Sequence, residues 1–283
     1  MESVFISGLG MIGSSLARSI RQGDDEVKIT GSDPDDANGQ FMIQSGLIDQ
    51  VVSFEQGAQQ ADVIFLCGPV DVIIDQIKEL PTLNLKPGVV VTDVGSTKAK
   101  IMTAAKVLSD HNITFVGGHP MAGSHLTGAK SGRTDLFSQA TYFLIPNNGM
   151  AGVEQIKRLL KTSTSKWRVV SIENHEQFVG AASHLPHVIA SSLVQATNSS
   201  LKNTEVGLES AAGGFRDTTR IAAADPDMWT AIMLSNQEVI LDQIDEFSKA
   251  LATIKQDIQA GNQTAIHNFF SKSQEIRQLI DQG

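Results

Sequence analysis

The sequence predicts an α/β domain built on a mainly parallel sheet, followed by an all-α domain. Over the first half of the chain, short apolar runs alternate with helical patterns, which is typical of a sheet covered by helices on both faces. These runs are continuously apolar, as in strands that are buried on both sides. Beyond about residue 174 only long amphipathic helical patterns occur. A length of 283 residues suits two such domains.

The elements of the α/β half follow from these patterns in chain order. The expected strands, each a short run rich in Val, Ile or Phe, lie at 4–10, 27–33, 50–53, 62–67, 89–95, 114–120, 140–146 and 167–173. The helices expected between them, from apolar residues at helical spacing, lie at 12–22, 37–45, 56–60, 98–108 and 152–161. We therefore expect domains at 1–165 and 166–283.

The C-terminal half contains helical stretches at 175–197, 228–259 and 264–280, and a glycine-containing loop at 207–220 separates the first two. Such long helices cannot bury their apolar stripes within one chain of this size. We therefore expect this half to pair two subunits into a homodimer.

Composition excludes several classes of function. The formal net charge of −9 argues against nucleic acid as a partner, because phosphate binding needs clustered Lys and Arg. No apolar stretch approaches the ~20 residues that a membrane span requires, and no signal peptide is evident. The single cysteine, Cys67, lies in an apolar run and is expected in a buried strand. We expect a soluble, cytoplasmic protein.

A glycine motif lies between the first strand and the first helix: Gly8, Gly10 and Gly13 enclose Met11 and Ile12 in the pattern GxGxxG. In a Rossmann-type domain these glycines permit a tight turn and let the backbone approach the pyrophosphate of a dinucleotide. The helix N-terminus then favours the anion. A glycine-rich turn in another α/β protein is the alternative.

Asp33 stands twenty residues beyond Gly13, at the end of the second strand. A carboxylate there accepts hydrogen bonds from the ribose hydroxyls of the cofactor and repels a 2′-phosphate. No Arg or Lys occurs within 34–40, so we expect NAD as the cofactor. Gly68 and Pro69, after a later strand, are expected beside the cofactor. The alternative is that Asp33 only starts a turn.

Two polar segments follow strands whose carboxyl ends should meet at the ligand-binding edge of the sheet. Ser96, in DVGSTK, is expected either to cap the next helix or to face the substrate. His119, in GGHPMAGSH, precedes Pro120, which keeps it out of helical geometry. An imidazole can act as a neutral base near neutral pH, so we expect His119 to be catalytic.

A third polar segment lies in the helical half. His184 and His187 are three residues apart and share one helix face, but no matching ligand set indicates a metal. Gly213 and Gly214 are followed by Arg216 and Arg220. This combination suits an anion pocket, because the planar guanidinium matches a carboxylate. The alternative is that both arginines pair with acidic neighbours on the surface.

Together these segments resemble the prephenate dehydrogenase family. The motifs GLGxIGxS, DVGSTK, GGHPMAGSH, HEQF with SHLPH, and GGFRDTTRIAAADPDMW follow one another in the family's order over about residues 1–245. The resemblance implies that NAD(P) is used to oxidise and decarboxylate prephenate to 4-hydroxyphenylpyruvate, in tyrosine biosynthesis. It also implies a dimer formed through the helical domain.

The resemblance implies a role for each matching position. His119 matches the catalytic histidine that takes the proton of the ring hydroxyl, and Ser96 matches the serine that helps hold this hydroxyl. Arg220 matches the arginine that binds a substrate carboxylate. His187 and Ser183 match positions in the substrate pocket.

Two neighbouring residues fall in the loop after the catalytic histidine. Ser124 lies in that loop, and His125 stands where many relatives carry an acidic or other polar group. Because His125 differs from those relatives, the resemblance does not identify the residue that recognises the side chain of the substrate. The chain also stops at Gly283, so the regulatory domain of some relatives is expected to be absent. Arogenate dehydrogenase, a dehydrogenase of 3-hydroxy acids and a non-catalytic NAD-sensing protein are the alternatives.

Overall fold

The computed structural model describes residues 1–123, 126–202 and 207–281. The strands in this part of the chain form one eight-stranded sheet in the order β3-β2-β1-β4-β5-β6-β7-β8. Their bounds are β1 (Ser3–Ser7), β2 (Lys28–Ser32), β3 (Gln50–Val51), β4 (Val63–Leu66), β5 (Val90–Asp93), β6 (Thr114–Pro120), β7 (Thr141–Pro146) and β8 (Lys166–Val169). All neighbouring pairs are parallel except β6 and β7, which are antiparallel.

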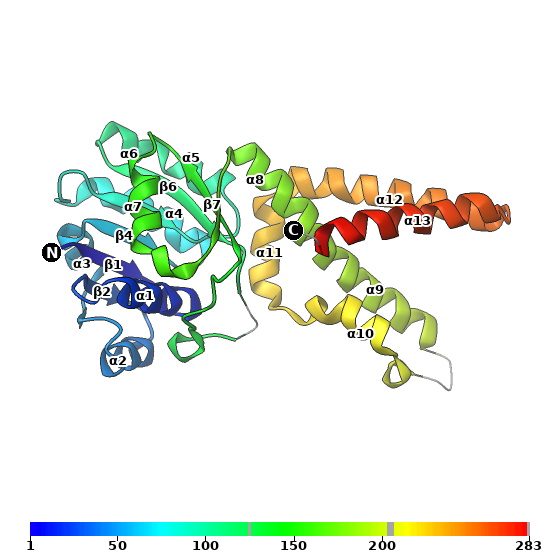
Figure 1. Ribbon diagram of the computed structural model, residues 1–283, viewed down its shortest axis with the longest axis horizontal. Helices are drawn as coiled ribbons and strands as arrows, with labels where there is room; N and C mark the ends of the chain where they lie inside the picture. Colours follow the sequence, from blue (N-terminus) through cyan, green and yellow to red (C-terminus); the bar gives the residue numbers. More distant parts are fainter. Residues whose placement is uncertain (124–125, 203–206, 282–283) are drawn as a thin grey trace.

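Helices cover both faces of the sheet (Figure 1). Those of this half are α1 (Met11–Gly23), α2 (Asp36–Gln44), α3 (Phe54–Gln60), α4 (Val70–Glu79), α5 (Ala99–Ala104), α6 (Lys106–Asp110) and α7 (Ala151–Leu159). One buried cluster joins α1, α2 and α7 to the sheet, and a second joins α3, α4, α5 and α6 to it. The strand order reverses between β1 and β4, and open α/β sheets bind ligands at that point.

The C-terminal half is helical throughout its described residues. It contains α8 (Ile172–Val179), a π-helical turn (Gly180–His184), α9 (Leu185–Leu201), α10 (Gly213–Thr219), α11 (Pro226–Ser235), α12 (Gln237–Gln259) and α13 (Gln263–Asp281). In Figure 1, α12 and α13 lie side by side and project away from the sheet. Helix α9 diverges from them in the same view. Helix α8 contacts α5 and so joins the two halves.

The predicted fold class is confirmed, with differences at particular elements. The expected strand at 167–173 is too long, because Ser171 accepts a hydrogen bond from the amide of Asn174 and starts α8 instead. Helix α4 was not expected, and the single helix expected at 98–108 is divided into α5 and α6. Because β8 pairs with β7, we propose that the domain boundary falls near residue 170 rather than at 165.

None of the helices in the described part of the chain is both long enough and apolar enough to cross a membrane.

Candidate active site

The glycine turn forms an open cradle at the carboxyl end of β1. Gly8 has φ +96°, a left-handed conformation that glycine adopts freely, and a Cβ there would lie 2.8 Å from the carbonyl carbon of Cys67. A Cβ on Gly13 would lie 1.9 Å from the Gly8 oxygen, so α1 packs too closely against the turn for any side chain.

Gly10 differs from these two glycines, because a Cβ there would meet no atom within 4 Å. It is the N-cap of α1, and no side chain caps this helix end. The first turn of α1 also carries no acidic residue. A helix N-terminus favours an anion, and the open space beside Gly10 leaves room for a pyrophosphate there. Of the two intervening residues, Ile12 packs partly into the core below the turn.

The structure shows the turn-forming contacts of Asp33 directly. Its carboxylate accepts the amide of Leu9 at 2.6 Å, the amide of Asp35 at 2.9 Å and the side-chain amide of Asn38 at 3.2 Å. These contacts shape the turn. Asp33 also lines a hollow of about 330 Å³, whose other lining residues are Asp36, Gly39, Gln40, Ile43, Gln44 and Val51. No Lys or Arg lines this hollow, so it suits an unphosphorylated ribose better than a 2′-phosphate.

The ends of β5 and β6 are joined by a buried carboxylate. Asp93 accepts the amide of Gly95 at 2.8 Å and the amide of Gly118 at 3.1 Å. Its remaining partner is the ammonium of Lys98, and neither side chain is exposed. Burial lowers the pKa of Lys98, and the charge of Asp93 opposes this effect. The network holds the loop with Ser96 against the strand that carries His119.

Ser96 does not cap the following helix, so that interpretation is wrong. Helix α5 begins at Ala99, and its N-terminus is covered by a residue of the helical half. The carboxylate oxygen Oε1 of Glu176 accepts the amide of Lys98 at 2.5 Å and the amide of Ala99 at 3.3 Å. Ser96 is half-buried in the loop between Asp93 and this helix end.

His119 lies at the end of β6 and is 8% exposed. Its Nδ1 is 2.9 Å from Nε2 of His175, and Nδ1 of His175 is 3.2 Å from Oε1 of Glu176. The pKa of His119 is well below its ordinary value, first because of burial and then because of the neighbouring His175, Lys98 and His184. His119 is therefore a neutral imidazole at physiological pH.

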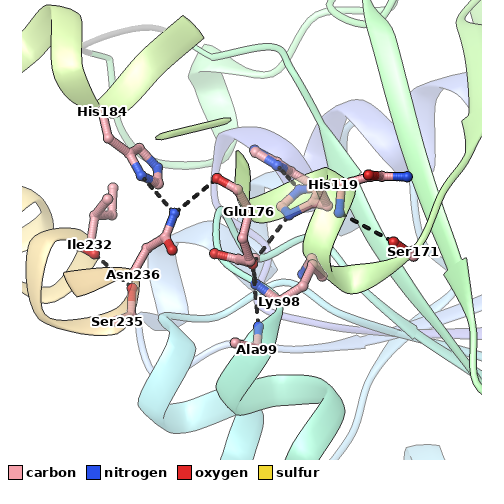
Figure 2. A network of polar contacts seen from close by, with 12 residues as sticks. Lys98, Ala99, His119, Ser171, Glu176, His184, Ile232, Ser235 and Asn236 are labelled. Atoms are coloured by element: carbon pink, nitrogen blue, oxygen red, sulfur yellow. Dashed lines mark hydrogen bonds and ion pairs between the residues drawn. The ribbon is translucent and has the colours of Figure 1, made fainter. Parts of the chain in front are cut away.

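From Glu176 the polar network continues to Asn236 and His184 within the helical half, as Figure 2 shows. Asn236 donates its side-chain amide to the backbone oxygen of Glu176 at 3.1 Å, and the same nitrogen lies 3.4 Å from Nδ1 of His184. Burial is the main cause that lowers the pKa of His184 to about 4. His184 ends the π-helical turn, an irregularity that often marks a functional site.

His187 lies on the next helical turn and stacks on Trp229, with ring centroids 3.5 Å apart and planes 24° apart. Its Nδ1 donates to the backbone oxygen of Ser183 at 2.9 Å. The pKa of His187 is lowered, mainly by burial, and the nearby charge of Arg220 adds to this effect. Arg220 itself follows α10 and is exposed.

The described residues show no ion pair of Arg216 or Arg220 with an acidic neighbour. Arg216 instead donates to the backbone oxygen of Ala211 at 3.0 Å. The alternative that both arginines pair with acidic neighbours on the surface is therefore not seen in the described residues. Gly68 and Pro69 follow β4, and the backbone of Gly68 lies 3.1 Å from where a Cβ on Gly8 would stand. Ser124 and His125 lie outside the described residues.

His175 and Glu176 were not predicted as site residues from the sequence. The motif HEQF contains both, but two adjacent polar residues near a helix start are usually exposed. The available signal was that both precede the histidine pair His184 and His187 by about ten residues. Only the fold shows that they are buried against the end of β6.

An open glycine turn at the strand reversal and a neutral imidazole at the same sheet edge define an NAD-dependent dehydrogenase with a helical second domain. Two family models match the chain: "Prephenate dehydrogenase, nucleotide-binding domain" over residues 16–169 and "Prephenate dehydrogenase, dimerization domain" over residues 171–272. The chain belongs to the prephenate dehydrogenase family.

Individual relatives agree with this assignment. A prephenate dehydrogenase of Lactococcus lactis subsp. cremoris is 39% identical over 282 residues, which cover 99% of this chain and 78% of the relative. The structure of prephenate dehydrogenase from A. aeolicus with hydroxyphenyl propionate and NAD+ has a TM-score of 0.89, 30% identity and coverage of 99% and 98%. An arogenate dehydrogenase of Synechocystis has a TM-score of 0.85, 26% identity and coverage of 98% and 99%.

Proposed function

We propose that this chain catalyses the oxidative decarboxylation of prephenate to 4-hydroxyphenylpyruvate with NAD, a step of tyrosine biosynthesis in the cytoplasm. The observation that carries the proposal is the neutral, nearly enclosed His119 at the sheet edge that also holds the glycine turn. A base in this place can take the proton of a hydroxyl group whose carbon loses a hydride.

The glycine turn and the Asp33 hollow would hold the dinucleotide. The amides at the start of α1 would receive the pyrophosphate, and Asp33 would accept the ribose hydroxyls. When bound, the nicotinamide ring takes up the hydride from the substrate. Gly68 and Pro69, at the end of β4, would border the same crevice.

His119 would take the hydroxyl proton from C4 of the substrate while the C4 hydride leaves, so that C4 becomes a carbonyl carbon. The electron pair of the bond between C1 and the carboxylate then moves into the ring as CO2 departs. The ring becomes aromatic, and the C4 oxygen recovers the proton from the His119 imidazolium. No net proton is consumed at the base. His119 thus orients the C4 hydroxyl and moves one proton from it and back.

The helical half would bind the anionic part of the substrate. Arg220 is proposed to pair with a substrate carboxylate, and His187 and Ser183 to line the pocket beside it. Ser96 is proposed to hold the C4 hydroxyl near His119. We also propose pocket roles for two residues of the loop after β6: Ser124 and His125.

The test is to measure NADH formation by the purified protein with prephenate and, in parallel, with arogenate. We expect a higher kcat/KM with prephenate and with NAD rather than NADP. A preference for arogenate would replace the substrate in this proposal, and no NADH with either substrate would refute it.

We also propose that the working enzyme is a homodimer formed through the helical half. Apolar side chains on α12 and α13 remain exposed in the single chain: Leu241, Leu251, Ile258, Phe269, Phe270, Ile276 and Leu279. A water-exposed apolar surface of this kind typically marks an interface. Light scattering coupled to size exclusion should give twice the chain mass of 30.3 kDa, and a monomer at working concentration would contradict the proposal.

A further inference from the structure

Nδ1 of His119 lies next to a buried polar pair from the helical half. His175 and Glu176 are consecutive residues near the start of α8, and the side chains are 0% and 6% exposed. His175 packs edge-on against Phe143 with ring centroids 5.3 Å apart, which fixes the plane of its ring. The His175 ring is thus held in place next to the proposed base.

Donor and acceptor roles can be assigned one after another along the series Glu176, His175 and His119. Glu176 Oε1 accepts hydrogen bonds from two backbone amides, those of Lys98 and Ala99, so this oxygen is an acceptor. The nearest nitrogen of His175, Nδ1 at 3.2 Å, must then carry a hydrogen to interact favourably with it. In a neutral ring this leaves Nε2 of His175 with a lone pair.

The same logic determines the tautomer of the proposed base. Nδ1 of His119 lies 2.9 Å from Nε2 of His175, and a lone pair there requires a hydrogen on Nδ1 of His119. The other nitrogen of His119, Nε2, then has the lone pair. Only in this tautomer can Nε2 of His119 accept a proton from a hydroxyl group of the substrate.

We infer that Glu176 and His175 are positioning residues that hold His119 as the Nδ1-protonated tautomer and so keep its Nε2 ready to accept the substrate proton. The inference rests on the proposed function, since it assigns the residues that prepare its base. It also assigns a second function to Glu176: the oxygen that interacts with His175 also covers the start of α5, after the loop that carries Ser96. A single carboxylate of the helical half thus interacts both with the histidine pair and with the start of α5.

Other titratable groups lie near the His119 ring and influence its pKa. Lys98, in the loop after β5, lies near it but is paired with Asp93. His184, from the π-helical turn, is also near, and burial keeps it neutral at physiological pH. When His119 becomes an imidazolium during the reaction, Glu176 is the carboxylate connected to it through His175. Its charge should therefore stabilise the protonated base.

Two substitutions of His175 separate hydrogen bonding from packing. In His175→Gln the amide oxygen can still accept from Nδ1 of His119, whereas His175→Phe keeps an aromatic ring against Phe143 but has no acceptor. We expect kcat to fall about 10–100-fold in His175→Phe and less in His175→Gln, with the KM for prephenate and the affinity for NAD unchanged. If the two variants lose equal activity, or His175→Phe keeps the wild-type kcat, the inference is wrong.

The substitution Glu176→Gln tests the charge. The amide oxygen can still accept from the α5 amides, but no negative charge remains to support the imidazolium. We expect a lower kcat and a fall of kcat/KM that begins at lower pH than in the wild type. The matched control is Glu173→Gln, an exposed glutamate in the first turn of the same helix, which should leave the profile unchanged. An unchanged profile in Glu176→Gln would overturn the role of the charge.

The tautomer can be observed without turnover, by nitrogen NMR of the full-length protein labelled with ¹⁵N-histidine. In the unliganded wild type we expect the His119 signals of a protonated Nδ1 and an unprotonated Nε2, and in His175→Phe a mixture of tautomers. A protonated Nε2 in the wild type would overturn the inference even if a variant fails to fold. Because this measurement needs no substrate, it still tests the tautomer if the proposed reaction is not observed.

Discussion

Lys98 forms a fully buried ion pair with Asp93, five residues earlier in the chain, and the same lysine adds to the electrostatic environment of His119. The carboxylate of Asp93 also receives backbone amides from the ends of β5 and β6. These contacts tie the ends of β5 and β6 together beneath His119 in a buried polar network. Its cation helps to keep the proposed base neutral.

The first prediction concerns this ion pair. Lys98→Met should lower the free energy of unfolding by about 3–5 kcal/mol, because it leaves the Asp93 carboxylate buried without a cation. The double variant Lys98→Met with Asp93→Asn should be more stable than the single variant. Urea denaturation measures both. Equal stability of single and double variants would show that the pair contributes little.

The second prediction concerns the base itself. His119→Asn should reduce kcat by about 10²–10⁴-fold, the usual contribution of a positioned base, and leave NAD binding unchanged. Steady-state kinetics and a fluorescence titration with NADH measure the two effects. Turnover near the wild-type level would remove His119 from the chemistry.

The third prediction is the pH dependence of kcat/KM. The base must be neutral to accept a proton. Burial, and after it the neighbouring histidines and Lys98, hold the pKa of His119 well below its ordinary value of 6.5. Activity should therefore be constant through neutral pH and fall only in acid, below the ordinary histidine range. A fall centred at or above the ordinary histidine pKa would contradict this assignment.

The fourth prediction concerns substrate binding. Arg220→Ala should mainly raise the KM for prephenate, because a carboxylate would lose a charge-assisted partner. Arg168→Ala is a suitable control, since Arg168 is exposed on β8 in the sheet domain. An unchanged KM in Arg220→Ala would exclude Arg220 from the pocket.

The fifth prediction concerns the cofactor. Asp33→Asn keeps an oxygen that can accept the Leu9 amide but removes the charge that would repel a 2′-phosphate. The ratio of kcat/KM for NADP to that for NAD should rise. Asp35→Asn, at the exposed N-cap of α2, should leave this ratio unchanged. A ratio that Asp33→Asn does not change would mean that the carboxylate only shapes the turn.

The sequence by itself determined those features that depend on neighbouring residues. The glycines between β1 and α1 are required by one local turn, so this turn could be predicted. The helices and strands could also be predicted, because their apolar spacing reflects which face of each element is buried. His119 could also be placed, because a strand and a proline fix its position at the sheet edge. The boundary at β8 was harder, since Ser171 starts a helix within an apolar run.

Tertiary structure alone decided how distant polar groups pair. His175 meets His119 across 56 residues, and Glu176 meets the Lys98 amide across 78. No local pattern encodes these contacts, because they arise only when α8 packs on α5 at the end of the sheet. Burial there removes water as a competing partner, so Nδ1 of His119, both ring nitrogens of His175 and Oε1 of Glu176 pair within the protein.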